Sequence, residues 1–279
     1  MGRRTKLIAI AASLAVSACD ASGGDDPDEP YGKISTNGLP FDADAIASLD
    51  TAPLAAARTG ESTLLAAETA ETLASTEEGR ELLRYVSYCA LAEHETLVVE
   101  DPDGEATHEM PGLIGLAPDW SGSPCDGECQ RWVSACLLAH ANGQGEPVAM
   151  SLRGEHPELA WTPALEDEFE VEEAAFYGNL FAAQPEKYAC IGRGLFDGSW
   201  AGQSSYLQGR VCGLTGAGCD VETTGTCHSI TGDGITDSAT CNRSDDGSAY
   251  AGCGTQARDR AGETFDEVIT VYLRPDGGL

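Results

Sequence analysis

Eleven cysteines constrain the folding of this 279-residue chain more than any other feature of its sequence. One lies near the N-terminus, four lie between positions 89 and 136, and six lie between positions 190 and 253. In an oxidising compartment, the two even-numbered groups are expected to form disulfides that staple two regions of the chain. The sequence leaves most pairings open, but Cys89–Cys136 is a specific prediction, because both residues fall on the buried faces of predicted helices. The candidates are Cys89, Cys125, Cys129, Cys136, Cys190, Cys212, Cys219, Cys227, Cys241 and Cys253.

The remaining cysteine, Cys19, follows a sequence that is typical of a secretory signal peptide. Basic residues occur among the first six positions, and an apolar run then extends from position 7 to position 18. The end of this run, LAVSAC at positions 14–19, resembles the bacterial lipobox. The resemblance implies that Cys19 becomes the first mature residue and carries acyl chains that anchor the protein to a membrane. The alternative is an ordinary secretory signal, with Cys19 as one more disulfide partner.

The segment after Cys19 is predicted to be a solvated tether. Positions 20–30 carry five acidic residues, no basic residue and almost nothing apolar, so burial cannot offset the entropy of ordering them. Asp20 resembles the residue that retains enterobacterial lipoproteins in the inner membrane, but this rule differs between bacterial groups. We therefore expect an exported protein on the cell membrane or outer membrane, facing the periplasm or the exterior. The predicted organisation is a lipoprotein signal peptide at 1–18, an acidic disordered tether at 19–42, an α+β domain at 43–189 and a disulfide-rich region at 190–279.

The charge balance excludes one large class of partners. With 46 acidic and 16 basic residues, the formal charge is −30, whereas generic nucleic-acid binding needs clustered Lys and Arg. Nucleotide binding is not expected either, because the single Gly-Lys pair, at positions 32–33, lacks the other residues of a P-loop. The expected partners are a membrane, through lipid on Cys19, and a protein or glycan that the sequence does not identify.

Hydrophobic periodicity predicts an α+β fold. A helix is expected from a Ser75 cap to position 90 and another over 127–141, with two further helices within 43–73. Strands are expected at 97–99, at 148–153 as a half-buried strand, and at 268–273 in the centre of a sheet, because that last run is apolar on both faces. The glycine- and serine-rich stretch from 190 to 253 is expected to form loops held by disulfides. The predicted architecture is a helical N-terminal half packed on a small, mostly antiparallel sheet, with a disulfide-stapled, loop-rich C-terminal region.

The sequence offers few candidates for chemistry. It contains no G-x-S-x-G or H-E-x-x-H motif, and we interpret His140, on an apolar helix face, as a core or capping histidine. Trp200 is flanked by small residues and is a candidate platform for ligand stacking, with core packing as the alternative. Positions 242–247 match part of a calcium loop, but Cys253 stands where the bidentate Glu would be. The residues that could still bind calcium, or simply form solvated acidic loops, are Asp233, Asp237, Asp245 and Asp246. No other cofactor is expected.

Three segments carry a resemblance to a known group: EGRELLRYVSYCAL at 78–91, GLAPDW at 115–120 and RWVSACLL at 131–138. They resemble cysteine-rich bacterial lipoproteins of myxobacterial type, over roughly residues 75–275. The resemblance implies a lipid-anchored envelope protein, and it assigns no activity, ligand or catalytic residue.

Two functions therefore remain after the sequence analysis. The first is a lipid-anchored, exported binding or surface-structural protein without catalytic activity. The alternative is a secreted-type hydrolase that acts on cell-wall or glycan substrates with an acidic catalytic pair. A buried carboxylate pair in a cleft would favour the hydrolase, whereas a surface without perturbed acids would favour binding.

Overall fold

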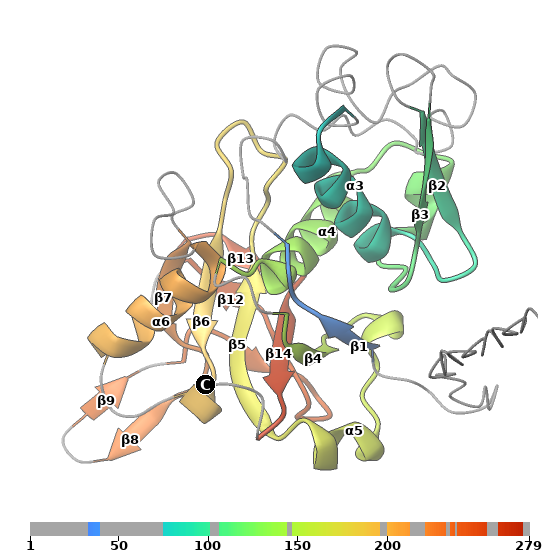
Figure 1. Ribbon diagram of the computed structural model, residues 1–279. Coiled ribbons are helices and arrows are strands. Elements are labelled where there is room, and N and C mark those ends of the chain that lie inside the picture. Colours follow the sequence, from blue (N-terminus) through green and yellow to red (C-terminus); the bar gives the residue numbers. More distant parts are fainter. Residues whose placement is uncertain are drawn as a thin grey trace, which may run out of the picture.

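The computed structural model describes residues 33–39, 75–100, 106–143, 147–195, 200–212, 221–232, 235–237, 239–255 and 262–275. Figure 1 shows these elements arranged around one large sheet. The helices are α3 (Glu77–Ala90), α4 (Gly127–His140), α5 (Pro163–Glu168) and α6 (Trp200–Cys212), with 3₁₀ helices η2 (Pro118–Ser121), η3 (Pro157–Leu159) and η4 (Arg193–Leu195). The strands are β1 (Lys33–Thr36), β2 (Thr96–Glu100), β3 (Thr107–Pro111), β4 (Ala149–Arg153), β5 (Val171–Tyr177), β6 (Tyr188–Ile191), β7 (Glu222–Thr226), β8 (Ile230–Gly232), β9 (Ile235–Asp237), β10 (Asn242–Arg243), β11 (Tyr250–Ala251), β12 (Cys253–Gly254), β13 (Thr264–Phe265) and β14 (Ile269–Leu273).

The large sheet has six strands in the order β1-β4-β14-β5-β6-β7. Every neighbouring pair is antiparallel except β6 and β7, which are parallel. The last strand in sequence, β14, therefore lies between two strands from the middle of the chain. The predicted α+β class, with a mostly antiparallel sheet, and the central position of the closing strand are both confirmed. The other strands form four two-stranded ladders.

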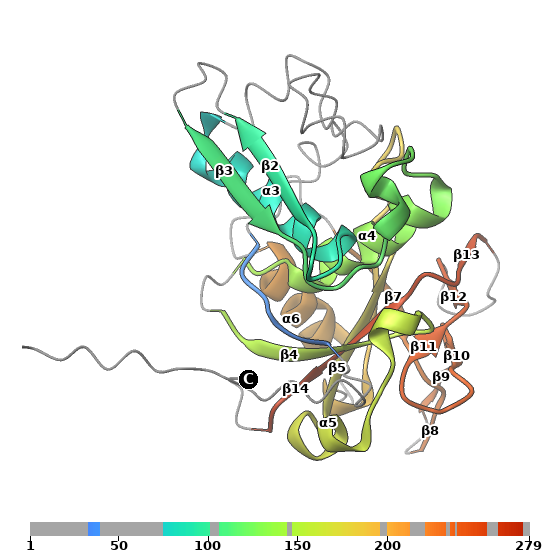
Figure 2. The same ribbon diagram turned by 90° about the vertical axis from the view of Figure 1, so that its right-hand side faces the viewer.

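Alternate residues of the central strands enter two different clusters, as the period of two of a β-strand requires. On β14, Ile269, Val271 and Leu273 join the cluster under the helices, while Tyr272 joins a smaller cluster on the opposite face. Figure 2 shows α6 and the β10–β11 ladder on opposite sides of the sheet. Both faces of the sheet are therefore covered, and we call them the helical face and the loop-rich face.

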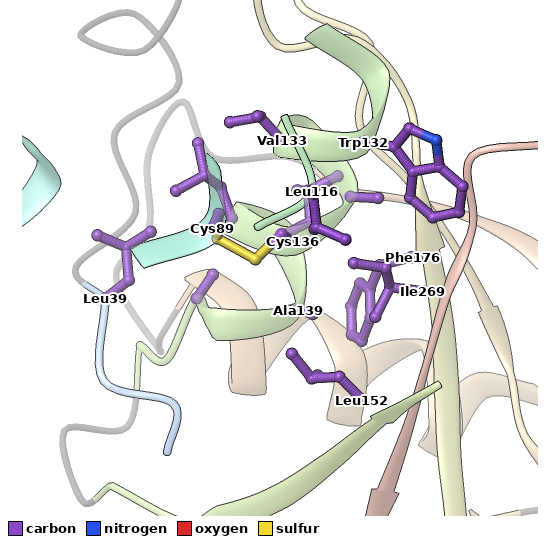
Figure 3. Close-up of a cluster of buried hydrophobic side chains, with 14 of the residues drawn as sticks. Leu39, Cys89, Leu116, Trp132, Val133, Cys136, Ala139, Leu152, Phe176 and Ile269 are labelled. Atoms are coloured by element: carbon purple, nitrogen blue, oxygen red, sulfur yellow. A yellow bond between two sulfur atoms is a disulfide. The ribbon is translucent and has the colours of Figure 1, made fainter. Parts of the chain in front are cut away.

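The helical face holds the larger apolar cluster. It is formed by α3, α4 and α6 against β4, β14, β5 and β6. Figure 3 shows its centre, where the Cys89–Cys136 disulfide joins α3 to α4 above Phe176 and Ile269 of the sheet. The Cα atoms of Cys89 and Cys136 lie 5.9 Å apart, and this specific pairing is confirmed.

The loop-rich face holds a cluster built around cysteines and aromatic residues. Its disulfides are Cys190–Cys227 and Cys241–Cys253, and the Sγ atoms of Cys190 and Cys241 lie 3.3 Å apart. Around them pack the buried rings of Tyr177, Tyr250 and Phe265. A short Cys125–Cys129 link lies at the start of α4, and Cys212 is also disulfide-bonded, to a partner outside the described residues.

Several local predictions need correction or extension. Helix α3 begins at Glu77 and its cap is Thr76, whose hydroxyl accepts from the Gly79 N–H, not Ser75. Strand β4 is not half-buried: Ser151 and Arg153 are buried too, because the loop-rich layer covers the face that alternation predicted to be exposed. Helix α6 was not predicted, since its sequence is poor in apolar residues. The disordered tether predicted at 19–42 is wrong over 33–39, because β1 pairs with β4 there and Leu39 is fully buried. The two helices expected within 43–73 lie outside the described residues.

None of the helices in the described part of the chain combines the length and the apolar character that a membrane crossing requires.

Candidate functional site

A polar cleft of about 620 Å³ opens on the loop-rich face of the sheet, at the end where β5 begins. Arg153 of β4, Tyr272 of β14 and Glu172 of β5 come from three adjacent strands of the sheet. The surrounding residues come from the segment before β5, from η4 and from the turn between β10 and β11. They are Trp161, Asp167, Phe169, Glu170, Arg193, Gly194, Arg243, Asp246, Gly247 and Ser248. This volume falls within the range of small-molecule sites.

Glu172 is the central buried carboxylate of the cleft. Its Oε1 accepts hydrogen bonds from the Tyr250 hydroxyl at 2.6 Å and from the Arg193 backbone N–H at 3.0 Å. Its Oε2 accepts from Arg243 Nη1 at 2.7 Å and from the Tyr272 hydroxyl at 2.9 Å. These four donors use the lone pairs that a carboxylate offers. Burial alone would raise the pKa of Glu172, but the bonds from Tyr250, Arg193 and Arg243 outweigh it and lower the pKa.

The donors around Glu172 are themselves held in place. Arg243 stacks on the Tyr250 ring and also donates to Tyr272 Oη and to the Gly247 carbonyl. Burial and the charge of Glu172 raise the pKa of Tyr250, and the same causes raise that of Tyr272 to about 12. Both phenols are therefore protonated at neutral pH and act as donors. The network is a rigid cross-link between the sheet and the loop-rich layer.

Arg193 differs from the other cleft arginines because its side chain is exposed and makes no hydrogen bond or ion pair within the described residues. Its backbone is tightly constrained. A Cβ on Gly192 would lie 2.4 Å from Glu172 O, and one on Gly194 would lie 2.9 Å from Glu172 N. The flanking glycines thus let η4 approach β5 closely, so that Arg193 is placed at the cleft by its backbone while its guanidinium remains available.

Asp246 belongs to the candidate calcium set, and its carboxylate serves the turn between β10 and β11. Its Oδ1 accepts from Ser244 Oγ, from Ser248 Oγ and from the Ser248 N–H, at 2.7–2.9 Å. Burial would raise its pKa, but the bonds from Ser248 and Ser244 lower it. Asp245 is exposed on the same turn. Asp237 lies in β9, and Asp233 lies outside the described residues.

Groups of three or more potential metal ligands occur twice in the described part of the chain. One is Cys89, Cys136 and His140, and the other is Cys190, Cys227 and Cys241. Every cysteine in both groups is in a disulfide, so none offers a thiolate to a metal ion. No acidic group of this kind gathers within the described residues.

A serine–histidine contact lies inside the helical face. His140 is fully buried, with Nδ1 2.8 Å from the Cys136 carbonyl and Nε2 2.6 Å from Ser35 Oγ. Burial lowers the pKa of His140 to about 4. The hydrogen bond to the Cys136 carbonyl raises this pKa in part, and the positive charge of Arg210 lowers it further. The ring is therefore neutral at pH 7, donates to Cys136 O and accepts from Ser35. Since Ser35 is only 4% exposed, the contact links β1 to α4. The interpretation of His140 as a core histidine is confirmed.

The cleft was not predicted from the sequence. Trp200 begins α6, and its side chain lies outside the described part; the half-exposed tryptophan of the cleft is Trp161. Cys19 and Cys219 also lie outside the described residues. The Gly-Arg-Gly sequence at 192–194 was the available signal for Arg193, because paired glycines indicate close backbone approach. Nothing in the sequence connects Arg193 to Trp161, because the cleft combines segments from five separate parts of the chain.

Comparison with known proteins adds no relative: no family model, curated protein or solved structure matches this chain.

Proposed function

We propose that this protein is an exported, lipid-anchored binding protein whose ligand site is the polar cleft on the loop-rich face. The anchor would be Cys19, as the lipobox-like sequence suggests, and the acidic segment at 20–30 would link it to β1 and hold the folded part away from the membrane. The cleft supports binding because it is concave, of suitable volume, and combines an aromatic surface with exposed charged groups.

The hydrogen bonding and lowered pKa of Glu172 are the observations that favour binding over hydrolysis. A glycosidase acid needs a carboxyl group with a raised pKa, facing a second carboxylate across the scissile bond. The pKa values of Glu172 and Asp246 are instead lowered, and donors already occupy both oxygens of Glu172. Glu186 has a raised pKa, through burial and the nearby Glu263, but it does not line the cleft. Glu172 is thus engaged in holding the walls of the cleft together and is not free to donate a proton.

Ligand screening of the purified chain tests the site. Thermal shift with short peptides, amino acids, neutral oligosaccharides and calcium should identify a class that raises Tm for the wild type. The same class should shift Trp161→Ala much less, while Ile34→Ala, at an exposed position on β1, should respond like the wild type. A class that shifts the wild type and both variants equally would place the binding site elsewhere.

The hydrolase alternative is tested on the same material. Chromogenic glycosides, esters and peptides should not be turned over. Robust turnover that is lost in Asp167→Asn, Glu170→Gln or Asp246→Asn, with an unchanged melting curve, would overturn the binding proposal. For the anchor, Cys19→Ala should abolish acyl labelling and release the protein from membranes; an unmodified Cys19 in the mature wild type would contradict it.

A further inference from the structure

Arg193 and Glu170 lie on neighbouring segments of one wall of the cleft. The 3₁₀ helix η4 packs directly on the start of β5, where the Arg193 N–H donates to Glu172 Oε1 at 3.0 Å. A Cβ on Gly194 would lie 2.7 Å from Val171 Cγ1, so η4 runs along β5 toward the residue that precedes this strand. That residue is Glu170, and both Glu170 and Arg193 are exposed and line the cleft. A cation and an anion therefore face the same region of the cleft.

These two charges differ from the central charges of the cleft because their side chains have no partner. Neither Arg193 nor Glu170 forms an ion pair within the described residues, with each other or with a third group. Arg243, in contrast, is paired with Glu172 at 2.7 Å, and the buried Arg153 donates to backbone carbonyls. An arginine and a glutamate that are neighbours but unpaired can together hold a ligand that carries both charges.

The surroundings of Arg193 favour a carboxylate. Burial lowers the pKa of His228, and the positive charges of Arg193 and Arg243 lower it further, so both guanidinium groups lie near this ring. The Nδ1 atom of His228 is buried and has no hydrogen-bond partner in the part of the chain that the structure describes. Nε, Nη1 and Nη2 of Arg243 each donate one bond, which leaves further N–H groups of this side chain unused. A guanidinium fork donates two parallel hydrogen bonds to a carboxylate, so Arg193 can bind one with unused donors nearby.

The position of Glu170 determines which carboxylates fit. A simple anion at Arg193 would be repelled by Glu170, and a simple cation at Glu170 would be repelled by Arg193. The formal charge of −30 also repels polyanions. In an α-amino acid, the ammonium nitrogen and the carboxylate carbon are bonded to the same atom and lie about 2.5 Å apart. Each added residue of an extended peptide separates its terminal charges by about 3.4 Å more, so a free amino acid matches neighbouring charges best.

We propose that the cleft binds a free α-amino acid, with its carboxylate at Arg193 and its ammonium group at Glu170. This inference rests on the proposed binding function, and it specifies the ligand class. The cleft of about 620 Å³ is larger than this charged head group requires, and Trp161 supplies a half-exposed ring within it. An amino acid with a large apolar side chain therefore fits better than glycine.

Calorimetry with leucine as the probe tests the inference on the full chain. Leucinamide, which lacks the carboxylate, and N-acetylleucine, which lacks the ammonium group, should each bind about tenfold more weakly than leucine. Arg193→Gln should weaken the binding of leucine about tenfold and leave that of leucinamide unchanged. Glu170→Gln should weaken the binding of leucine about tenfold and leave that of N-acetylleucine unchanged. The matched controls are Arg84→Gln on α3 and Glu109→Gln on β3, both at exposed positions, and each should bind leucine like the wild type.

This crossed pattern distinguishes contacts with the ligand from an effect on folding, because a distorted cleft would weaken the binding of every probe alike. Equal weakening of all three probes in either variant, or unchanged binding of leucine in both, overturns the assignment of the two charges. Tighter binding of glycyl-leucine than of leucine overturns it in favour of a peptide. If leucine does not bind while another class in the thermal screen depends on Trp161, the amino-acid inference is overturned and the binding cleft stands. If no class depends on Trp161, both proposals fail together.

Discussion

The helical and loop-rich faces of the central sheet are both buried, but different interactions hold them. On the helical face, α3, α4 and α6 enclose one large apolar cluster that contains the Cys89–Cys136 and Cys125–Cys129 disulfides. On the loop-rich face, two disulfides, buried tyrosines and the Glu172 network take the place of helices. A layer of short ladders and turns cannot bury enough apolar area by itself, so covalent and polar links supply its order.

Two consecutive glutamates of β5 show the same contrast at one point. Glu173 serves the helical face, where it pairs with Arg210 of α6 at 3.0 Å and both side chains are at most 5% exposed. Glu172 serves the loop-rich face, where Arg243 remains 29% exposed at the cleft. The pairing of β5 with β14 shifts register here, matching Tyr272 with Glu172 and Val271 with Ala174. The buried Glu173–Arg210 pair is part of the core of the helical face, whereas the more exposed Glu172–Arg243 pair lines the cleft.

Removing Arg210 should have the largest effect on stability. Arg210→Met leaves Glu173 buried without its cation and frees the carbonyls of Ala139 and Ala141, to which Arg210 also donates. We expect a loss of about 3–5 kcal/mol in urea unfolding. Arg243→Met on the other face should cost about 2 kcal/mol, because Glu172 keeps three other donors. Equal losses for the two variants would remove the proposed difference between the faces.

Removing a disulfide from the loop-rich face should have the next largest effect. Replacing Cys190 and Cys227 together by Ala opens a 37-residue separation, and the chain-entropy relation gives about 4 kcal/mol. The Cys125–Cys129 pair spans four residues and should cost about 2 kcal/mol when replaced in the same way. Hydrogen exchange should show lost protection in β7, β10 and β11 while α4 stays protected. Uniform loss of protection across both faces would contradict the view that disulfides stabilise the loop-rich face independently of the helical face.

Acid should weaken the helical face through His140. Its folded pKa near 4 lies below the unfolded value of 6.5, so this stabilisation is complete above pH 6.5 and is lost as the pH falls toward 4. The difference corresponds to about 3 kcal/mol. His156 and His228 also have pKa values lowered by burial, so the test compares wild type with His140→Gln. The variant should show a shallower decline in unfolding free energy between pH 6.5 and 4; parallel curves would refute the contribution of His140.

Local patterns predicted local structure, and the site depends on long-range contacts. Helix α4, strand β2 and the central position of β14 followed from periodicity and from runs of apolar residues. The acidic start of β5 concealed a buried strand, because the cations that neutralise Glu172 and Glu173 lie 71 and 37 residues away. The same separation hid the cleft, whose residues share no spacing in the sequence.

The position of β14 sets the order in which the chain can fold. Its Tyr272 bonds Glu172 across 100 residues, so β4 and β5 have no strand between them until the end of the chain is available. At about 5–20 residues per second, ribosomal synthesis of that interval takes about 5–20 s. During this time the partly made chain exposes two unpaired strand edges, and such long-range pairing folds slowly. The six-stranded sheet can therefore be completed only after β14 has been synthesised.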